Sequence, residues 1–412
     1  MKSSKVDTFN WRTWLVQVVC FVLMFVNSVV TLIAASFPGL GFPCYYAALV
    51  DYSALNLTVR NGVWVRRRAG HLTPTLFLET PELFAYVVFT ALVLLAVAVY
   101  YIVGAVAIRR AKKKFEFTAS LNQLSAWITL VGDPTTLFLG ILRMWTLQLF
   151  VLLLSYKHVV LAAFVYLLHF ACSVAFTVSF ITRGYSSAWY SKFVEQLIPP
   201  NPLLHRVVGP GRAVVVNLYL LLLALETLVF SLSLMLALGN SFYISVSDTV
   251  FGAVNLFLIL AVVWLIVTEL VLSKYVKVLF GPYLGTLVFV GSLGLALPVY
   301  RRYEAIFVSA TQAPNLHTGV RINLAVIAIL CLAMIVVRLV RAYLYHRKKH
   351  TKFFVRMPKS RYKALVSKAR VRSSMRSRRR PSPLSPKVRA RRRNEPSLNQ
   401  APRASYLREE ES

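Results

Sequence analysis

The stretch LFAYVVFTALVLLAVAVYYIVGAVAI, Leu83 to Ile108, is followed directly by RRAKKK at 109–114. As a helix rising ~1.5 Å per residue, it is long enough to cross the ~30 Å hydrocarbon core of a bilayer. The run contains no charged residue, and five basic residues lie in the six positions after it. Basic residues beside a span tend to stay on the cytoplasmic side. The stretch therefore predicts a transmembrane helix together with its direction.

Seven further apolar runs are spread along the 412 residues, of which 57% are hydrophobic. A soluble chain could not bury so much apolar surface, so the composition is typical of a multi-pass membrane protein. We predict an all-α bundle of eight transmembrane helices. The predicted spans are 15–36, 83–108, 135–155, 159–182, 213–238, 249–272, 281–299 and 322–340. The first run could instead be a cleavable signal peptide, with Ile33 and Ala35 at the cleavage site.

An even number of spans places both ends of the chain on one side, and the basic residues indicate which side. The segments on the same side of the membrane as the two termini hold fourteen lysines and arginines, not counting the tail. The segments on the opposite side hold eight. The positive-inside rule then makes that side cytoplasmic. We predict cytoplasmic segments at 1–14, 109–134, 183–212 and 341–412, with lumenal loops at 37–82 and 300–321.

The formal charge of +32 is concentrated at the end of the chain, because 23 of the 47 lysines and arginines lie in 341–412. That tail is rich in Arg, Ser and Pro and is predicted to be largely disordered. Nuclear targeting or RNA binding is one interpretation of such arginine runs. Beside a membrane span, contact with anionic lipid or an acidic protein is favoured, so we predict no nucleic-acid partner.

The first lumenal loop holds two covalent candidates. Cys44 is the one cysteine outside an apolar run, so it has no lumenal partner within its own chain. An unpaired cysteine in an oxidising lumen predicts an intermolecular disulfide; a buried free thiol or a homodimer bridge are the alternatives. Asn56 begins the sequence Asn-Leu-Thr, an acceptor for N-glycosylation that is not always occupied. Arg66, Arg67 and Arg68 form either a solvated turn or a contact for an acidic surface.

Arg143 and Glu226 lie near the middles of the third and fifth spans. A charge in hydrocarbon is costly unless it is paired or hydrated. The two side chains are therefore predicted to pair inside the bundle or to line a polar cavity, and a structural pair is favoured. Glu269 and Arg338 lie near span ends, where long side chains can reach the interface. Gly281 and Gly285 are spaced for close helix packing.

No catalytic, cofactor-binding or metal site emerges, because the seven histidines are scattered and no phosphate-binding loop or nucleophile elbow is present. The tail instead holds two sorting signals. Tyr362-Lys-Ala-Leu365 matches a tyrosine signal that clathrin-type adaptors bind in extended form. Glu409, Glu410 and Glu411 form a small acidic cluster.

Several ordered blocks resemble one known family. They are Phe37–Tyr45, Leu49–Tyr52, Ala54–Thr58, His71–Leu78, Leu154–His158, Asn217–Tyr219, Ala224–Glu226, Phe230–Ser233, Gly239–Tyr243 and Tyr303–Phe307. On these blocks the sequence resembles the envelope glycoprotein M family of herpesviruses, most of all its gammaherpesvirus branch. The resemblance covers nearly all of 1–340 and fades in the tail.

The resemblance implies more than the spacing does. It implies eight spans with both ends cytoplasmic, no enzymatic activity, and a disulfide-linked heterodimer with glycoprotein N, with Cys44 at the matching position. It also implies roles in virion assembly, secondary envelopment and egress, with trafficking to Golgi, trans-Golgi, endosomal and inner nuclear membranes. Tegument proteins would bind the cytoplasmic loops and tail. The alternative is a transporter or receptor-like protein in which Arg143 and Glu226 line a substrate path.

Overall fold

The apolar runs form long helices in a computed structural model of the protein. The structure describes residues 3–36, 57–60, 63–66, 80–115, 121–156, 158–185, 202–242, 244, 246–276, 278–299 and 314–348. The elements in chain order are α1 Ser3–Ser36, β1 Leu57–Arg60, β2 Val63–Arg66, α3 Thr80–Phe115, α4 Leu121–Val131, α5 Pro134–Ser155, α6 Val159–Thr182, α8 Pro202–Arg206, the π-helix η3 Val207–Gly211, α9 Arg212–Phe242, α10 Val246–Leu270, the 3-10 helix η4 Leu272–Lys274, α11 Gly281–Val299 and α13 Pro314–Lys348.

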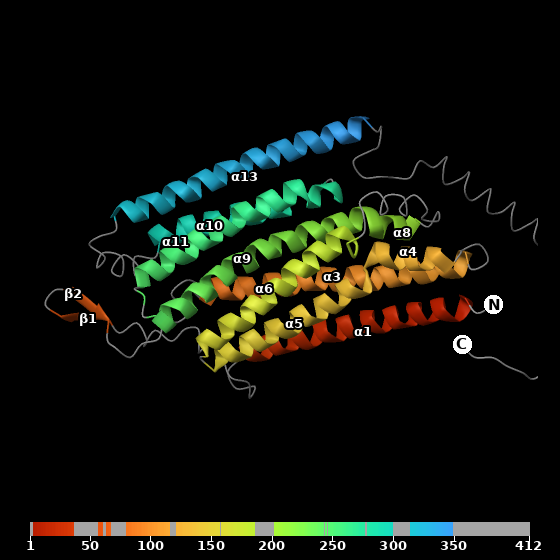
Figure 1. The fold of residues 1–412 in the computed structure, drawn as a ribbon, viewed down its shortest axis with the longest axis horizontal. Helices are drawn as coiled ribbons and strands as arrows, with labels where there is room; N and C mark the ends of the chain where they lie inside the picture. Colours follow the sequence, from red (N-terminus) through yellow and green to blue (C-terminus); the bar gives the residue numbers. More distant parts are fainter. Residues whose placement is uncertain are drawn as a thin grey trace, which may run out of the picture. The chain divides into compact units, whose positions relative to one another are not determined.

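Helix α9 is the central element, and it contacts α3, α6, α10 and α11 (Figure 1). In the most apolar window of Leu203–Phe242, 78% of the residues are buried. The corresponding share is 22% for Trp11–Ala34 in α1 and for Arg321–Leu344 in α13. These two helices lie at opposite edges of the bundle in Figure 1. The hydrophobic core therefore surrounds α9, and α1 and α13 each turn most of their surface outward.

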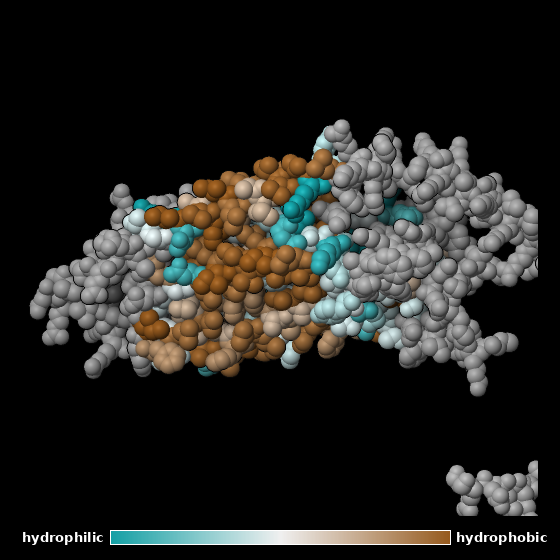
Figure 2. Space-filling view, turned by 45° about the horizontal axis from the view of Figure 1, so that its top comes forward, coloured by the Kyte–Doolittle hydropathy of each residue, from teal (hydrophilic) through white to brown (hydrophobic). Residues whose placement is uncertain are grey.

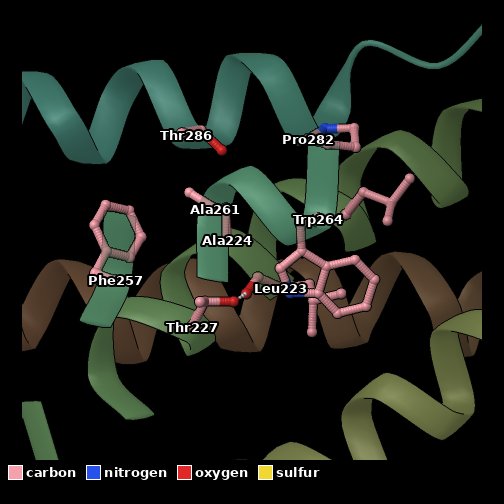
Figure 3. A pocket seen from close by; sticks show the side chains of 9 residues that line it. Leu223, Ala224, Thr227, Phe257, Ala261, Trp264, Pro282 and Thr286 are labelled. Atoms are coloured by element: carbon pink, nitrogen blue, oxygen red, sulfur yellow. Dashed lines mark hydrogen bonds between the residues drawn. The ribbon is translucent and has the colours of Figure 1, made fainter. Parts of the chain in front are cut away.

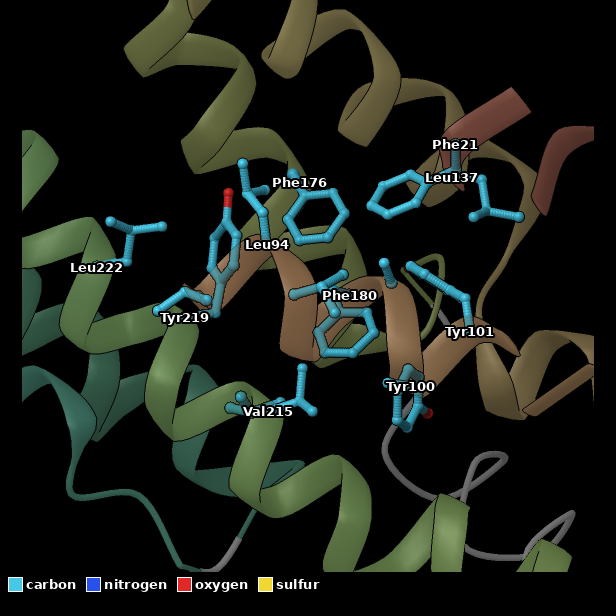
Figure 4. Packing of buried hydrophobic residues seen from close by; sticks show 14 of the residues in the cluster. Phe21, Leu94, Tyr100, Tyr101, Leu137, Phe176, Phe180, Val215, Tyr219 and Leu222 are labelled. Carbon is cyan, nitrogen blue, oxygen red and sulfur yellow. The ribbon is translucent and has the colours of Figure 1, made fainter. Parts of the chain in front are cut away.

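Two clusters of buried residues flank α9. The larger one joins α1, α3, α5 and α6 to one side of α9, and its aromatic rings point toward one another in Figure 4. Within it the rings of Phe176 and Phe180 stack at 5.6 Å, and Phe21 meets Tyr101 edge-on at 5.1 Å. The smaller cluster joins α9 to α10, α11 and α13. Such aromatic packing fixes the helices against one another beyond what their buried area contributes.

The outer surface has the apolar character expected of a protein in lipid. Figure 2 shows a broad hydrophobic zone with hydrophilic residues toward its ends. Seven helices in the described part of the chain are long and apolar enough to cross a membrane. The all-α multi-pass class is thus confirmed, whereas the count of eight stays a prediction. The uncertain span is α11, whose apolar part, Gly281–Leu293, is shorter than the others.

A small hairpin interrupts the all-α pattern that we predicted. Strands β1 and β2 pair antiparallel, with Leu57 opposite Arg66 and Arg60 opposite Val63. Both strands are rich in β-branched or aromatic residues, and Asn-Gly at 61–62 separates them in the sequence. Two such segments separated by this dipeptide are a strong hairpin signal, so the hairpin could have been predicted from the sequence. Arg66, from the arginine cluster of the first loop, is the last residue of β2.

The segment 109–134, which we predicted as a cytoplasmic connection, is largely helical and packs into the bundle. It holds the end of α3 and all of α4, whose Trp127, Leu130 and Val131 are buried. Trp14 of α1 donates a hydrogen bond of 2.7 Å from Nε1 to the carbonyl oxygen of Gly132. The apolar side chains of α4 thus place it in the protein interior.

The sequence Gly-Asp-Pro at 132–134 defines the start of α5. Asp133 is the N-cap residue, and its carboxylate accepts a hydrogen bond of 3.1 Å from the backbone N–H of Thr135. Pro134 follows at the first helical position, where its missing N–H costs nothing. This cap fixes where α5, the helix that carries Arg143, begins.

The end of the predicted loop 183–212 is helical too, because α8 and η3 continue into α9. At the other end of the loop, Arg183 and Gly184 close α6 with φ angles of 57° and 70°. Arg212 donates from Nη2 to the carbonyl oxygens of Phe180 and Ile181, at 2.9 and 2.6 Å. These carbonyls lie in the last turn of α6, where helix oxygens need partners. The basic residue therefore binds α6 to α9.

The last helix extends beyond the span 322–340 in both directions. Helix α13 begins at Pro314, within the segment that we predicted as the lumenal loop 300–321, and ends at Lys348, within the predicted tail. Proline is well suited to a first helical turn, which explains the early start.

The small-residue spacing in α11 brings it close to α9, as predicted. A Cβ added at Gly281 would lie 2.2 Å from the backbone oxygen of Asn217, and one at Gly285 would lie 2.8 Å from the Cβ of Ala224. A Cβ at Gly291, by contrast, would meet nothing within 4 Å. The close approach is therefore confined to the first half of α11.

Candidate functional site

The two charges that we predicted inside the membrane meet in the structure. Arg143 of α5 donates from Nη2 to the carboxylate oxygen Oε1 of Glu226 on α9. Their side chains are 2% and 0% exposed. Burial of this kind is tolerated because each charge neutralises the other, whereas either one alone would be strongly unfavourable. The pair thus joins α5 to the central helix α9.

Helix α6 completes the cluster with residues that the sequence did not single out. The Nε of Arg143 donates to the hydroxyl of Ser173 at 2.6 Å. His169 lies one turn before Ser173 on the same helix face, and its Nε2 is 3.7 Å from Oε1 of Glu226. The guanidinium carbon of Arg143 also lies 4.8 Å from the centroid of the Tyr219 ring. We refer to Arg143, His169, Ser173 and Glu226 as the α5–α6–α9 charge cluster.

The histidine has a defined orientation. Its Nδ1 lies 3.0 Å from the backbone carbonyl oxygen of Arg143, and a carbonyl oxygen only accepts hydrogen bonds. Nδ1 therefore carries a proton, and Nε2 faces the carboxylate of Glu226. The second carboxylate oxygen, Oε2, is buried without a hydrogen-bond partner. The charge cluster holds three helices at one point.

A small cavity lies near the cluster but is not lined by it. Helices α9, α10 and α11 enclose it, with Thr227, Phe257, Trp264 and Thr286 among its walls (Figure 3). Its volume, measured as the space open to the centre of a water molecule, is about 10 Å³. This is room for roughly one water. Neither Arg143 nor Glu226 belongs to the lining.

Glu269 forms a second cluster, at which α10, α11 and α13 meet. Its Oε1 accepts a hydrogen bond of 2.7 Å from Nε of Arg338 and another from the hydroxyl of Tyr283. Its Oε2 lies 3.1 Å from Nη1 of Arg341. We predicted that Glu269 and Arg338 can reach the interface from the span ends, and the structure shows that they also pair with each other. The side chains of Arg338 and Glu269 are 6% and 18% exposed.

Replacing Glu269 with leucine is expected to loosen α13 from the bundle. The change leaves the buried Arg338 without its carboxylate partner, at a cost of about 1–3 kcal/mol. We expect a lower midpoint of thermal unfolding for the detergent-purified chain. The matched control is Glu304→Leu, at a glutamate in the predicted lumenal loop 300–321. An unchanged midpoint for Glu269→Leu would show that the cluster does not hold α13.

The other predicted site residues lie outside the described part of the chain. They are Cys44, Asn56, Tyr362, Leu365, Glu409, Glu410 and Glu411. The β-hairpin begins directly after Asn56. In the described part, no group of three or more His, Cys, Asp or Glu side chains is placed to hold a metal ion.

The bundle, its apolar surface and its buried charges define a multi-pass integral membrane protein. Residues 7–357 match the family model of herpesvirus glycoprotein M. The chain belongs to this family, which confirms the predicted resemblance, and the family is one of structural viral membrane proteins rather than enzymes.

Curated relatives support this assignment over most of the chain. Envelope glycoprotein M of Saimiriine herpesvirus 2 is 52% identical over 359 residues, covering 87% of this chain and 93% of the relative. Envelope glycoprotein M of Equine herpesvirus 2 is 52% identical, and the match covers 83% of this chain and 86% of the relative. Envelope glycoprotein M of Epstein-Barr virus (strain B95-8) is 50% identical, and the match covers 83% of this chain and 80% of the relative. No solved structure matches the chain. The protein is thus a multi-pass component of the virion envelope membrane.

Proposed function

We propose that the chain is a membrane scaffold for virion assembly that carries glycoprotein N as a disulfide-linked partner on Cys44. The observation that carries the proposal is the family match over residues 7–357, which includes the first predicted lumenal loop. Cys44 is the one cysteine of the chain outside an apolar run. A thiol without a partner in its own chain is available to a second protein in an oxidising compartment. The bundle anchors the pair in the membrane.

A scaffold accounts for the interior better than a transporter does. The Arg143–Glu226 pair is buried and neutral overall, and neither residue lines the cavity beside α9. That cavity, in the described part of the chain, has room for roughly one water and does not accommodate a substrate. In transporters, substrate sites are built at discontinuous helices with several polar groups. We therefore assign the charge pair to holding helices together.

The cytoplasmic segments would supply the contacts for envelopment and egress. Tyr362 and Leu365 are spaced for the two pockets of a clathrin-type adaptor, and Glu409–Glu411 add an acidic signal. These signals would direct the protein to Golgi, trans-Golgi and endosomal membranes, and it would also reach the inner nuclear membrane. The cytoplasmic loops and the basic tail would bind tegument proteins. A glycan on Asn56 would lie in the same lumenal loop as Cys44.

Replacing Cys44 with serine is expected to remove every covalent complex with glycoprotein N. Serine cannot form a disulfide, and the other three cysteines lie in apolar spans. The measurement is non-reducing gel electrophoresis of the full-length chain coexpressed with glycoprotein N. The matched control is Cys172→Ser, at a buried cysteine within α6, which should leave the complex intact. If the wild-type chain forms no reducible complex, the covalent part of the proposal is wrong.

A further inference from the structure

Helix α1 carries a line of polar and sulfur-containing residues within its membrane-spanning part. Thr13, Gln17, Cys20, Met24, Asn27 and Thr31 follow one another at steps of three or four residues. Residues at this spacing share one face of a helix. Cys20 and Asn27 are exposed, and α1 as a whole is among the least buried of the long helices. The line therefore lies on the outside of the bundle.

Helix α5 lies beside this line and continues the surface. Phe138, Trp145 and Leu152 are exposed and are seven residues apart, so they form a second line along α5. One hydrogen bond joins the two lines, from Nδ2 of Asn27 to Oε1 of Gln148 at 3.2 Å. We call the surface formed by Gln17, Cys20, Asn27, Trp145 and Gln148 the α1–α5 surface.

The amides of the α1–α5 surface differ in how accessible they are. Nε2 of Gln148 and Oε1 of Gln17 are buried polar atoms, so a helix that packs on the outside of the bundle does not reach them. Asn27 is exposed, although its amide can make several hydrogen bonds. Lipid chains offer no donors or acceptors, so amides in contact with lipid lose the hydrogen bonds that water would provide. A neighbouring helix with its own polar side chains can restore them.

The opposite edge of the bundle lacks this character. Helix α13 is as little buried as α1, but its exposed residues between 324 and 337 are all apolar, and they include Val326, Ile329 and Val336. Such a surface is suited to lipid. The two edge helices therefore differ in chemistry, and of the two only α1 offers an ordered, exposed amide, that of Asn27, to a partner helix.

The position of Cys44 indicates which helix occupies this surface. Cys44 lies eight residues after Ser36, the last residue of α1. Eight extended residues reach at most about 27 Å, so a protein bonded to Cys44 is held close to the end of α1. Tethering of this kind raises the effective concentration of a membrane-anchored partner at the neighbouring helices.

We propose that the transmembrane helix of the partner bonded at Cys44 packs lengthwise on the α1–α5 surface and forms hydrogen bonds with the exposed amide of Asn27, which Gln148 orients through its Oε1. This inference rests on the proposed function, which supplies glycoprotein N as that partner. The partner helix then presents Ser, Thr, Asn or Gln to the amide of Asn27 and small or apolar side chains to Cys20 and Trp145. The disulfide secures a complex that the membrane contact has already aligned.

The contact is tested without the disulfide. In the full-length chain with Cys44→Ser, glycoprotein N should still copurify in mild detergent. Adding Asn27→Leu and Gln148→Leu should lower the amount recovered by roughly tenfold, because the exposed amide of Asn27 and the side chain that orients it are both lost. The matched control is Ser292→Leu, which removes an exposed polar side chain from α11 and should change nothing. Equal recovery with and without the two amides would overturn the proposal.

Cys20 allows a second measurement that keeps the amides in place. In the Cys44→Ser chain, oxidation should link Cys20 to single cysteines placed along the partner helix, with reactive positions recurring every three or four residues. Cys20→Ser should abolish the links. A link between two copies of this chain in place of the partner would overturn the proposal. The two claims can be distinguished. If Cys20 forms links with the partner helix but the wild-type chain forms no reducible complex, the proposed disulfide at Cys44 is wrong and the helix contact on the α1–α5 surface is supported.

Discussion

Replacing Glu226 with leucine is expected to remove most of the folded protein from the membrane. The change leaves Arg143 charged and 2% exposed in the interior, without the carboxylate that neutralises it. Breaking a buried ion pair from one side costs about 3–5 kcal/mol, a large part of the stability of a typical domain. The measurement is the yield of monodisperse full-length protein by size-exclusion chromatography in mild detergent, together with the midpoint of thermal unfolding.

The control for this prediction removes both charges. Arg143→Met with Glu226→Leu replaces the pair with apolar side chains, which is often neutral or stabilising in buried sites. The double variant is therefore expected to recover most of the yield and to bind glycoprotein N as the wild type does. If Glu226→Leu alone is as stable as the wild type, the pair does not hold the bundle. If the double variant folds but no longer supports envelopment, the charges have a functional role, as a transporter would require.

Two members of the α5–α6–α9 charge cluster could be predicted from the sequence, and two could not. Arg143 and Glu226 stand out because each interrupts a long apolar run, and two opposite charges in hydrocarbon need each other. His169 and Ser173 lie in an equally apolar run, but neither is a permanently charged side chain that demands an oppositely charged partner. Their spacing of four residues was the available signal. It gains meaning only once α6 is known to face Arg143.

The remaining differences have similar causes. Glu269 and Arg338 lie near span ends, where a sequence cannot distinguish a side chain that reaches water from one that binds a neighbouring helix. Helix α4 is too short to span a membrane, and the hydrogen bond that Gly132 receives directly after it comes from Trp14, in a distant part of the chain. The β-hairpin could have been predicted, since Asn61-Gly62 separates two short segments rich in β-branched and aromatic residues.

Replacing Gly281 with alanine is expected to displace α11 from the centre of the bundle. The added Cβ would lie 2.2 Å from the backbone oxygen of Asn217, and backbone of a buried helix cannot move aside cheaply. Asn217 also holds the start of α11, because its Oδ1 accepts hydrogen bonds from the N–H groups of Phe280 and Gly281 at 2.6 and 2.8 Å. Overpacking a tight contact costs about 1–3 kcal/mol, and losing these bonds adds to that cost.

Gly291→Ala in the same helix is the matched control, because a Cβ there meets nothing within 4 Å. Alanine favours helix over glycine by about 1 kcal/mol, so this variant should be at least as stable as the wild type. The two substitutions make the same chemical change ten residues apart, and opposite shifts in the midpoint of thermal unfolding are expected. Equal shifts would mean that the close approach of α11 to α9 at Gly281 contributes nothing to the fold. Opposite shifts would show that the close contact between Gly281 and the backbone of Asn217 fixes the position of α11 on α9, beside the smaller hydrophobic cluster.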